Sequence, residues 1–342
     1  MFDKFYEFLY LKVLINIVTS KSKTIVYTEM LNKQGVVESY EKEFDTNYLN
    51  PEMREYIHKL SKESPYYYIS LLDSSLSQGA IPSTSKHTMG MFHDLSASEY
   101  KSFDDKWTFY TAKTDLYAIE KVYEKIGLDF IISPFVVLAN FFKDKINSNV
   151  AMFVMVEEGT LALSIFKNSQ LLYADYIDLK VEMEFDSLEI DDHDIEEISL
   201  EEEDGIDLDD LDTLDEIDDL DDFGDIADLD SIDELEDFDE TKDVEEELAV
   251  QEEQDYDDFP AENTDGLNED YQRFSLIQSS VNIFYQDERF ESEFIENVYI
   301  ADGVGVSGDL KKYLEEEMFL NVYVRRAELA SELCEIAKME LS

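Results

Sequence analysis

One segment of the chain is so acidic that it excludes most ways of folding it. Residues 182–270 hold 45 acidic residues and one basic residue, Lys242, for a net charge of −44. The whole chain carries −56, so the remaining 253 of its 342 residues carry only −12. Such a composition cannot bury enough apolar surface to offset self-repulsion and the loss of chain entropy. We therefore interpret residues 181–270 as a disordered acidic insertion.

The two parts that flank this insertion are residues 1–180 and 271–342. A hydrophobic content of 44% and an aromatic content of 13% support a real core in the chain as a whole. A part of about 70 residues buries only a marginal core by itself. We therefore expect both flanks to belong to one fold, with residues 271–342 completing a lobe that begins before residue 180.

Apolar residues recur at every third position inside the acidic insertion. A spacing of three drifts by about 60° per step around an α-helix, so no helix face stays apolar. The segment can be a solvated spacer, or it can dock on a basic partner through its apolar points. A loose Ca²⁺ or Mg²⁺ site is a further alternative. The docking points that we select are Leu211, Leu214, Ile217 and Leu220.

The charge balance also limits partners and compartment. Nucleic-acid and anionic-lipid surfaces are disfavoured, because binding to them depends on Lys and Arg. Mimicry of nucleic acid by the acidic insertion is an alternative of lower rank. The single cysteine, Cys334, cannot form an internal disulfide, and residues 1–18 lack the pattern of a signal peptide or a membrane span. We expect a cytoplasmic protein with no metal site and no membrane span.

Residue patterns predict an α/β fold in which a meander of strands followed by helices occurs twice. The expected strands are Val13–Val18, Thr24–Met30, Val36–Phe44, Tyr66–Leu72, Lys106–Ala112, Leu128–Ile132, Val150–Val156, Thr160–Lys167, Leu171–Leu179, Asn297–Ala301 and Val322–Val324. The expected helices are Pro51–Lys62, Leu116–Ile126, Phe135–Phe142, Tyr271–Tyr285 and Asp309–Met318. Gly127 is the residue expected to end the second helix in a left-handed conformation.

Three stretches resemble a known family. Trp107–Phe142, the hairpin Leu161–Leu179 and the ending Val298–Val324 are similar to the actin-like cytoplasmic proteins of type IV pilus and type II secretion platforms, the PilM and GspL families. The resemblance implies a two-lobed actin-like (ribonuclease H-like) fold. It also implies a partner, the cytoplasmic tail of a bitopic inner-membrane platform protein, and a second partner in some members, the assembly ATPase. The protein would then associate with the inner membrane through these partners, in a pilus, secretion or DNA-uptake (transformation) system.

The same resemblance locates a nucleotide cleft whose motifs are degenerate here. Family ATPases typically carry Asp-x-Gly in two hairpin turns, because backbone amides must approach phosphates and Asp organises Mg²⁺. We read the first turn as Asn16–Ser20, without Gly or acid, and place Glu157 or Glu158 at the Gly position of the second. We therefore expect an adaptor that is not an enzyme and needs no cofactor, with an active ATPase or kinase as the alternative. The residues of this degenerate cleft are Thr19, Ser20, Gly159, Gly303 and Gly305.

Two other motifs point to different chemistry. Gly303, Gly305 and Gly308 spell G-x-G-x-x-G between an expected strand and an expected helix, with Arg325 and Arg326 after the next strand, as in an NAD(P)-binding unit. We prefer a tight strand-to-helix connection, because only 18 residues follow Val324. The stretch KHTMGMFHD, with His87, Met89, Met91, His93 and Asp94, is interpreted as a polar loop and not a metal site, because its spacing matches no strong zinc pattern.

Overall fold

A computed structural model describes residues 10–146, 149–179 and 264–341, and these residues belong to one compact unit. A second unit, residues 188–261, lies outside the described residues, as does nearly all of the expected acidic insertion. The selected docking points Leu211, Leu214, Ile217 and Leu220 fall there.

The first sheet is five-stranded, with the order β3-β2-β1-β4-β8. Its strands are β1 (Lys12–Thr19), β2 (Thr24–Asn32), β3 (Gly35–Phe44), β4 (Tyr66–Leu72) and β8 (Phe130–Ile132). The first three strands form an antiparallel meander, while β4 pairs in parallel with both β1 and β8. β1 is almost entirely buried, which agrees with its near-continuous apolar run.

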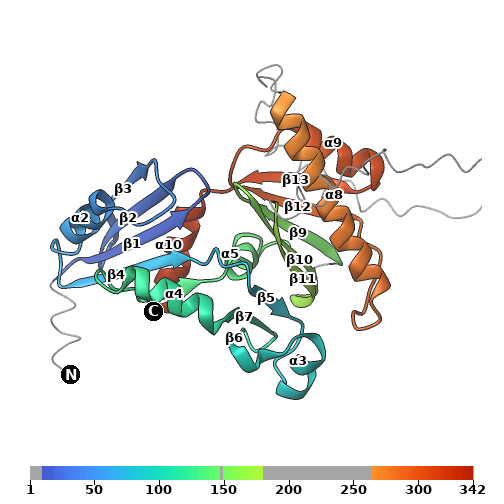
Figure 1. Cartoon of the computed structure of the whole chain (residues 1–342), viewed down its shortest axis with the longest axis horizontal. Helices are drawn as coiled ribbons and strands as arrows, with labels where there is room; N and C mark the ends of the chain where they lie inside the picture. Colours follow the sequence, from blue (N-terminus) through green and yellow to red (C-terminus); the bar gives the residue numbers. More distant parts are fainter. Residues whose placement is uncertain (1–9, 147–148, 180–263, 342) are drawn as a thin grey trace, which may run out of the picture. The chain divides into compact units, whose positions relative to one another are not determined.

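The second sheet repeats this plan, with the order β11-β10-β9-β12-β13. Its strands are β9 (Ala151–Val156), β10 (Thr160–Lys167), β11 (Gln170–Asp178), β12 (Asn297–Asp302) and β13 (Asn321–Arg326). The meander again comes first, and β12 pairs in parallel with β9 and β13 (Figure 1). Strands from before and after the acidic segment thus lie side by side. The expected duplicated α/β fold with two lobes is confirmed.

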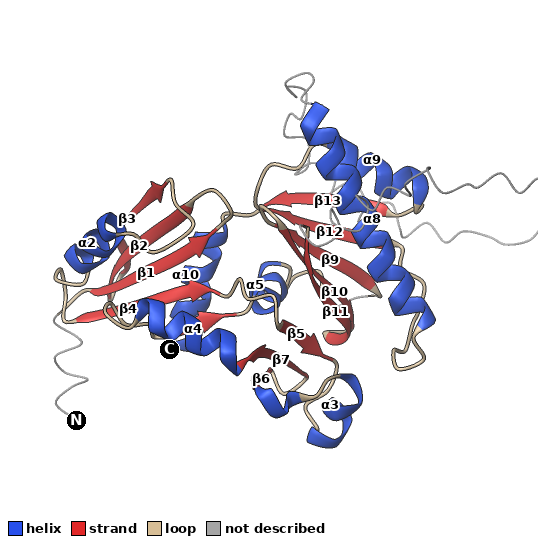
Figure 2. Cartoon of the chain, viewed as in Figure 1, coloured by secondary structure: helices blue, strands red, loops and turns tan. Residues whose placement is uncertain are grey.

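A third, three-stranded sheet was not expected. It has the order β5-β7-β6, formed by Gln78–Ile81, Trp107–Ala112 and Ser98–Phe103. Between β5 and β6 lie the short helix α3 (Lys86–Phe92) and a single 3-10 turn, η1 (Leu95–Ala97) (Figure 2). The sequence predicts only β7 here and assigns KHTMGMFHD to a loop, which is wrong. Short strands without strict alternation, next to Gly, Pro and Ser, carry too weak a pattern to be recognised.

Six longer helices complete the described fold, and capping residues define several of their starts. Asn50 accepts a hydrogen bond from the Met53 amide, and Ser133 accepts one from the Phe135 amide; each cap precedes a proline at the first helical position. Gly127 adopts a φ of +79°, as expected. The helices are α2 (Pro51–Leu60), α4 (Lys113–Tyr123), α5 (Pro134–Phe141), α8 (Thr264–Gln286), α9 (Gly308–Glu317) and α10 (Leu329–Glu340).

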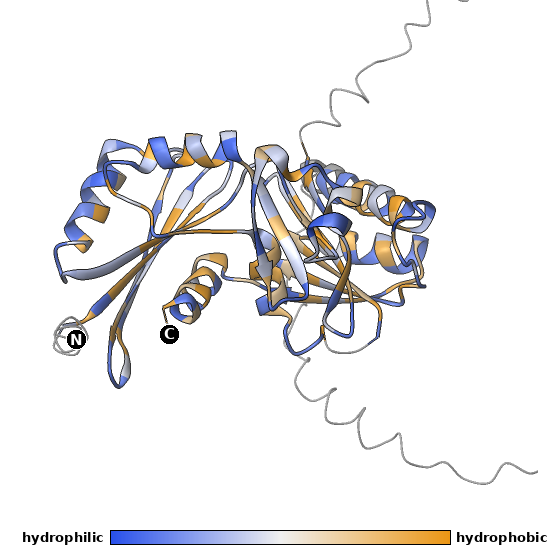
Figure 3. Cartoon of the chain, turned by 90° about the horizontal axis from the view of Figure 1, so that it is seen from below, coloured by the Kyte–Doolittle hydropathy of each residue, from blue (hydrophilic) through white to orange (hydrophobic). Residues whose placement is uncertain are grey.

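Several helices differ from the sequence prediction; α4, for example, spans Lys113–Tyr123 and not Leu116–Ile126. α8 begins at Thr264 instead of Tyr271, so Glu269 and Asp270 belong to a helix and not to the acidic insertion. α10 was not predicted at all, although it buries Leu333, Cys334 and Ile336. The alternation of apolar and polar residues along the helices is visible in Figure 3.

Three hydrophobic clusters hold the described unit together. One packs the first sheet against α2, through residues such as Met53 and Ile57. Another packs the second sheet against α8 and α9. The third contains α5 and α10 together with Trp107 of β7 and Phe153 of β9. Because this cluster contains residues of all three sheets, it joins the sheets into one packed unit.

Candidate functional site

The hairpin turn of the first sheet contacts the corresponding turn of the second sheet. The amide and hydroxyl of Ser22 both donate to Oε2 of Glu158, at 3.1 and 2.8 Å. The side chain of Lys21 lies directly against Gly159, so that a Cβ atom added to Gly159 would overlap its Cε. Two turns that face a nucleotide in actin-like ATPases are thus bridged here by the chain's own side chains.

The sequence placed the first of these turns too early. Asn16, Ile17, Val18 and Thr19 all belong to β1, and the turn itself is closed by the Ser20 amide donating to the Lys23 carbonyl at 2.8 Å. Asn is a residue type common in turns, but Asn16 is buried in β1 and donates through Nδ2 to the Tyr27 carbonyl. Thr19 is therefore the end of a strand, and Ser20 is half-buried in the turn.

The second turn does contain a glycine in a conformation that favours glycine. Gly159 has a φ of +105°, and its amide donates to the Glu157 carbonyl at 2.8 Å. The expectation that Glu157 or Glu158 occupies the glycine position is therefore wrong. The acids precede the glycine instead: Glu158 turns toward Ser22, while Glu157 is buried.

Burial raises the pKa of the Glu157 carboxyl to about 7. Burial, and then the charge of Glu157, also raise the pKa of the Tyr176 hydroxyl. A carboxyl group in this position is therefore largely neutral at mildly acidic pH and becomes an uncompensated negative charge at higher pH. A phosphate brought to this turn at alkaline pH would meet that charge and the Glu158 carboxylate.

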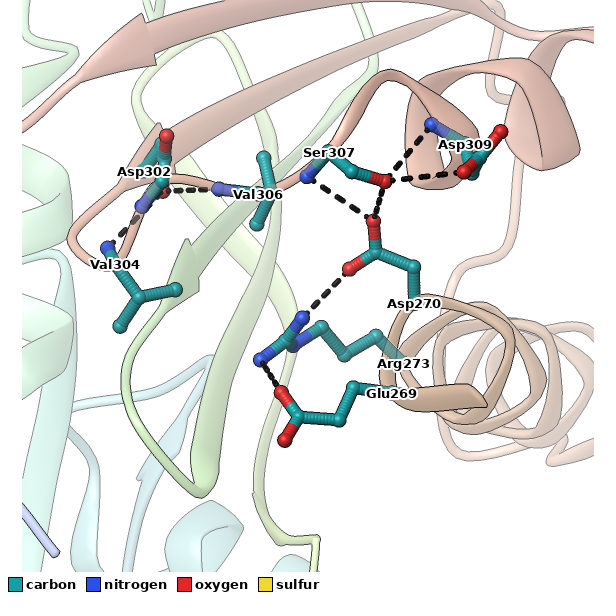
Figure 4. A network of polar contacts seen from close by, with 9 residues as sticks. Glu269, Asp270, Arg273, Asp302, Val304, Val306, Ser307 and Asp309 are labelled. Carbon is teal, nitrogen blue, oxygen red and sulfur yellow. Dashed lines mark hydrogen bonds and ion pairs between the residues drawn. The ribbon is translucent and has the colours of Figure 1, made fainter. Parts of the chain in front are cut away.

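The glycine-rich loop that contains Gly303 and Gly305 connects β12 to α9. Oδ1 of Asp302 accepts hydrogen bonds from the amides of Val304, Gly305 and Val306, at 3.0, 2.7 and 3.0 Å (Figure 4). Gly305 has a φ of +82°. A Cβ atom on Gly303 would lie 2.9 Å from the Val156 carbonyl oxygen, so the loop needs a glycine to approach β9. Successive amides that could cradle an anion are therefore occupied by a carboxylate of the chain.

A buried ion pair supports the same loop, and sequence analysis missed it. Arg273 of α8 donates to Asp270 at 2.6 Å and to Glu269 at 2.8 Å. The other oxygen of Asp270 accepts from the amide and hydroxyl of Ser307, which caps α9 (Figure 4). The i, i+3 and i, i+4 spacing of these residues on one helix was the available signal. It was hidden because the two acids resemble the end of the acidic insertion.

The stretch KHTMGMFHD forms α3 and the two residues that follow it, His93 and Asp94, which precede η1. The His93 ring stacks on Tyr110 with the ring centres 4.2 Å apart, and His87 is exposed. Asp94 accepts from the Ser96 amide, and this hydrogen bond lowers the pKa of its carboxyl. In the ranges that the structure describes, no group of three or more His, Cys, Asp and Glu side chains is arranged to hold a metal ion.

A cavity of about 570 Å³ lies where the third sheet meets α5 and α10. Its lining combines aromatic side chains with a rim of lysines. The cavity is lined by residues that include Lys101, Phe103, Trp107, Asn140, Phe166 and Met339. The sequence did not indicate this cavity, because β6 and α10, which form part of its walls, were not predicted.

The two sheets of identical strand order, with their meander turns in contact, give the chain an actin-like fold. Its residues 152–342 match the family model described as "Domain of unknown function (DUF8341)", and the chain belongs to that family. Residues 10–139 match a second model, "Domain of unknown function (DUF8569)". No curated protein matches the chain.

Several solved structures are similar to the whole chain at low sequence identity. A Bacteroides thetaiotaomicron protein with an actin-like ATPase fold and unknown function is 11% identical, with 96% of this chain and 98% of that chain covered and a TM-score of 0.47. A PilM–PilN type IV pilus biogenesis complex is 10% identical, with 91% and 88% covered and a TM-score of 0.46. MreB 5 of Spiroplasma citri bound to AMPPNP is 8% identical, with 96% and 97% covered and a TM-score of 0.42.

Among the described residues, no helix combines the length and the apolar character needed to cross a bilayer.

Proposed function

We propose that this protein is a non-enzymatic, actin-like adaptor in the cytoplasm, where it binds the cytoplasmic tail of a membrane protein. One observation carries the proposal. The two turns that would face a nucleotide are joined by Lys21, Ser22 and Glu158, so phosphate could enter only after these contacts break. The carboxylate of Asp302 within the glycine-rich loop supports the same conclusion.

The cavity is the place that we propose for the partner's tail. Its volume of about 570 Å³ suits a few apolar side chains, and its walls include Phe103, Trp107 and Phe166. Aromatic walls give a large contact area at a low cost in side-chain entropy, which favours recognition of an extended segment. The resemblance of Trp107–Phe142 and Val298–Val324 to platform proteins supports a pilus, secretion or DNA-uptake assembly as the setting.

Trp107 makes this proposal testable, because it is the only tryptophan of the chain and lines the cavity. Synthetic peptides that copy the cytoplasmic tails of candidate bitopic membrane proteins are titrated into the full chain while tryptophan emission is recorded. The expected result is a saturable shift with one tail. Asn140→Phe, which fills the cavity, should abolish the shift, while Asn282→Phe on the exposed side of α8 should not. Equal binding by both variants would contradict the cavity as the site.

A second contact region is proposed for the acidic segment, whose apolar points lie outside the described residues. Its net charge would steer a basic surface, such as that of an assembly ATPase, toward several weak docking points. Replacing Leu211, Leu214, Ile217 and Leu220 with Ser keeps every acid and should weaken capture of that partner. Binding should also weaken with salt, since charge attraction is screened over about 8 Å at physiological ionic strength. Unchanged capture by the Ser variant would leave the segment as a spacer.

A further inference from the structure

Sheet edges expose backbone groups that can pair with another strand, and three of the four edges of the two large sheets are protected. β8 consists of three residues only. β3 carries Glu38, Glu41 and Glu43, and its pairing with β2 contains an irregularity between Met30 and Leu31. β11 packs beside β5 of the third sheet. Short length, charge, irregular pairing and coverage are the usual protections of an edge.

β13 lacks three of these protections: short length, irregular pairing and coverage by another strand of the described chain. It pairs with β12 in register over all its residues, from Asn321 to Arg326, without a bulge. The Asn321 amide donates to the Glu296 carbonyl, and the Ala327 amide donates to the Asp302 carbonyl. The backbone N–H and C=O groups of the odd-numbered residues therefore face β12. The backbone groups of Val322, Val324 and Arg326 therefore point outward. Among the described residues they have no hydrogen-bond partner.

A row of stacked rings crosses the second sheet and ends at this edge. Phe153 of β9 stacks on Tyr299 of β12 at 5.2 Å, and Tyr299 stacks on Tyr323 of β13 at 5.1 Å, with interplanar angles of 14° and 18°. The outer face of the last ring is not paired with a ring from the described chain, and Tyr323 is 41% exposed. A side chain on an added strand would extend this row.

The charge of the edge selects the kind of strand that could be added. Arg325 and Arg326 are exposed at the end of β13, in a chain whose net charge is −56. On the face of Tyr323, the next residue of the same strand is Arg325, which also contacts Asp144 at 3.5 Å and remains 45% exposed. A carboxylate on the added strand, two residues from an aromatic or apolar side chain, would meet this arginine.

We propose that the β13 edge binds an extended peptide of a partner protein by strand addition, with an apolar or aromatic residue on Tyr323 and an acidic residue at Arg325. A second copy of the chain is the less suitable occupant, because β13, with the sequence NVYVRR, offers no acidic residue to meet Arg325. The site is separate from the cavity and does not depend on the proposed adaptor function.

The test uses a fluorescein-labelled peptide, Thr-Val-Thr-Phe-Thr-Glu-Thr-Val, and its analogue N-methylated at alternate amides. Fluorescence anisotropy with the full chain should give saturable binding of the first peptide with a Kd below about 1 mM, and no binding of the analogue. Hydrogen exchange should slow at the amides of Val322, Val324 and Arg326 when the peptide is bound. Binding weaker than about 1 mM, or equal binding of both peptides, would overturn the proposal.

Variants separate the edge from a general charge effect. Val324→Pro removes an outward amide that β12 does not use, and should weaken binding at least about ten-fold. Arg325→Glu should weaken it about five-fold or more, while Lys312→Glu on α9, with the same change in charge, should have no effect. Equal losses in Arg325→Glu and Lys312→Glu would overturn the assignment to the edge. Dimerisation of the peptide-free chain that Val324→Pro abolishes would assign the edge to a second copy.

Discussion

Single residues explain why the expected nucleotide cleft is closed by the chain itself. Gly159 lets the second turn pass beneath the side chain of Lys21, and Asp302 satisfies three amides of the glycine-rich loop. In the proposed function, these contacts take the place of contacts that a phosphate would make with the two turns and the loop. The proposed function therefore depends on a few residues, and a single substitution at such a residue should lower the free energy of unfolding by a predictable amount.

Gly159→Ala should destabilise the protein. A φ of +105° is strained for alanine, and the new Cβ must also displace the flexible end of Lys21, so we expect a loss of about 1–2 kcal/mol in the free energy of unfolding. Urea denaturation measures this value. Gly90→Ala in α3, where nothing lies within 4 Å of the added Cβ and φ is not positive, is the control and should be neutral or slightly stabilising. Similar values for both variants would contradict the strain at Gly159.

Glu157 should make stability depend on pH in an unusual direction. Its pKa is about 7 in the folded protein against about 4.5 as a model group, so the folded state binds more protons between these values. Stability from this group is therefore fully present below pH 4.5 and is lost as pH rises through 7, by about 3 kcal/mol at most. Glu157→Gln should remove this loss. We expect the variant to gain stability relative to the wild type between pH 5 and pH 8, and a constant difference would contradict the burial of a titrating carboxyl.

At the scale of elements, most strands and helices with strong periodicity could be predicted, and the elements that were missed have physical reasons. β4 and β10 agree with the prediction residue for residue. α10 was missed because charged residues such as Glu332 and Lys338 alternate with its apolar residues, so its apolar face is hard to recognise in the sequence. The cavity could not be predicted, since two of the elements that line it, β6 and α10, were missed. The turns of the cleft were located only approximately, because buried Asn16 resembles a turn residue.

α10 contributes an ion pair that should be sensitive to mutation. Nζ of Lys338 lies 2.6 Å from Oε2 of Glu29, whose side chain is 6% exposed, while Lys338 itself is 23% exposed. Lys338→Ala would leave the buried Glu29 carboxylate without this cation, with the hydrogen bond from the Tyr27 hydroxyl remaining. Allowing for partial solvent screening, we expect a loss of about 2–3 kcal/mol in the free energy of unfolding. The exposed Lys312→Ala on α9 should change it by less than about 0.5 kcal/mol, and equal losses would contradict a specific role of the pair.

At the scale of the whole molecule, the acidic segment and the folded unit should be separable. Removing residues 188–261 takes away no described contact, so the melting temperature should change by no more than a few degrees. A longer deletion, 188–270, also removes Asp270 and with it the ion pair to Arg273 and the hydrogen bonds to Ser307. That variant should melt markedly lower. Calorimetry of both deletions tests the boundary, and a large loss in the shorter one would show that the segment stabilises the fold.

The central claim is that this actin-like fold serves binding without nucleotide. Isothermal titration calorimetry of the full chain with ATP and Mg²⁺ tests it most directly, with the Trp107 emission as a check that the protein is folded. Because Lys21, Ser22 and Glu158 bridge the two hairpin turns and Asp302 occupies the amides of the glycine-rich loop, we expect no binding tighter than about 1 mM. A saturating titration with a Kd in the low-micromolar range would contradict the account and make the protein a nucleotide-binding member of the actin-like fold.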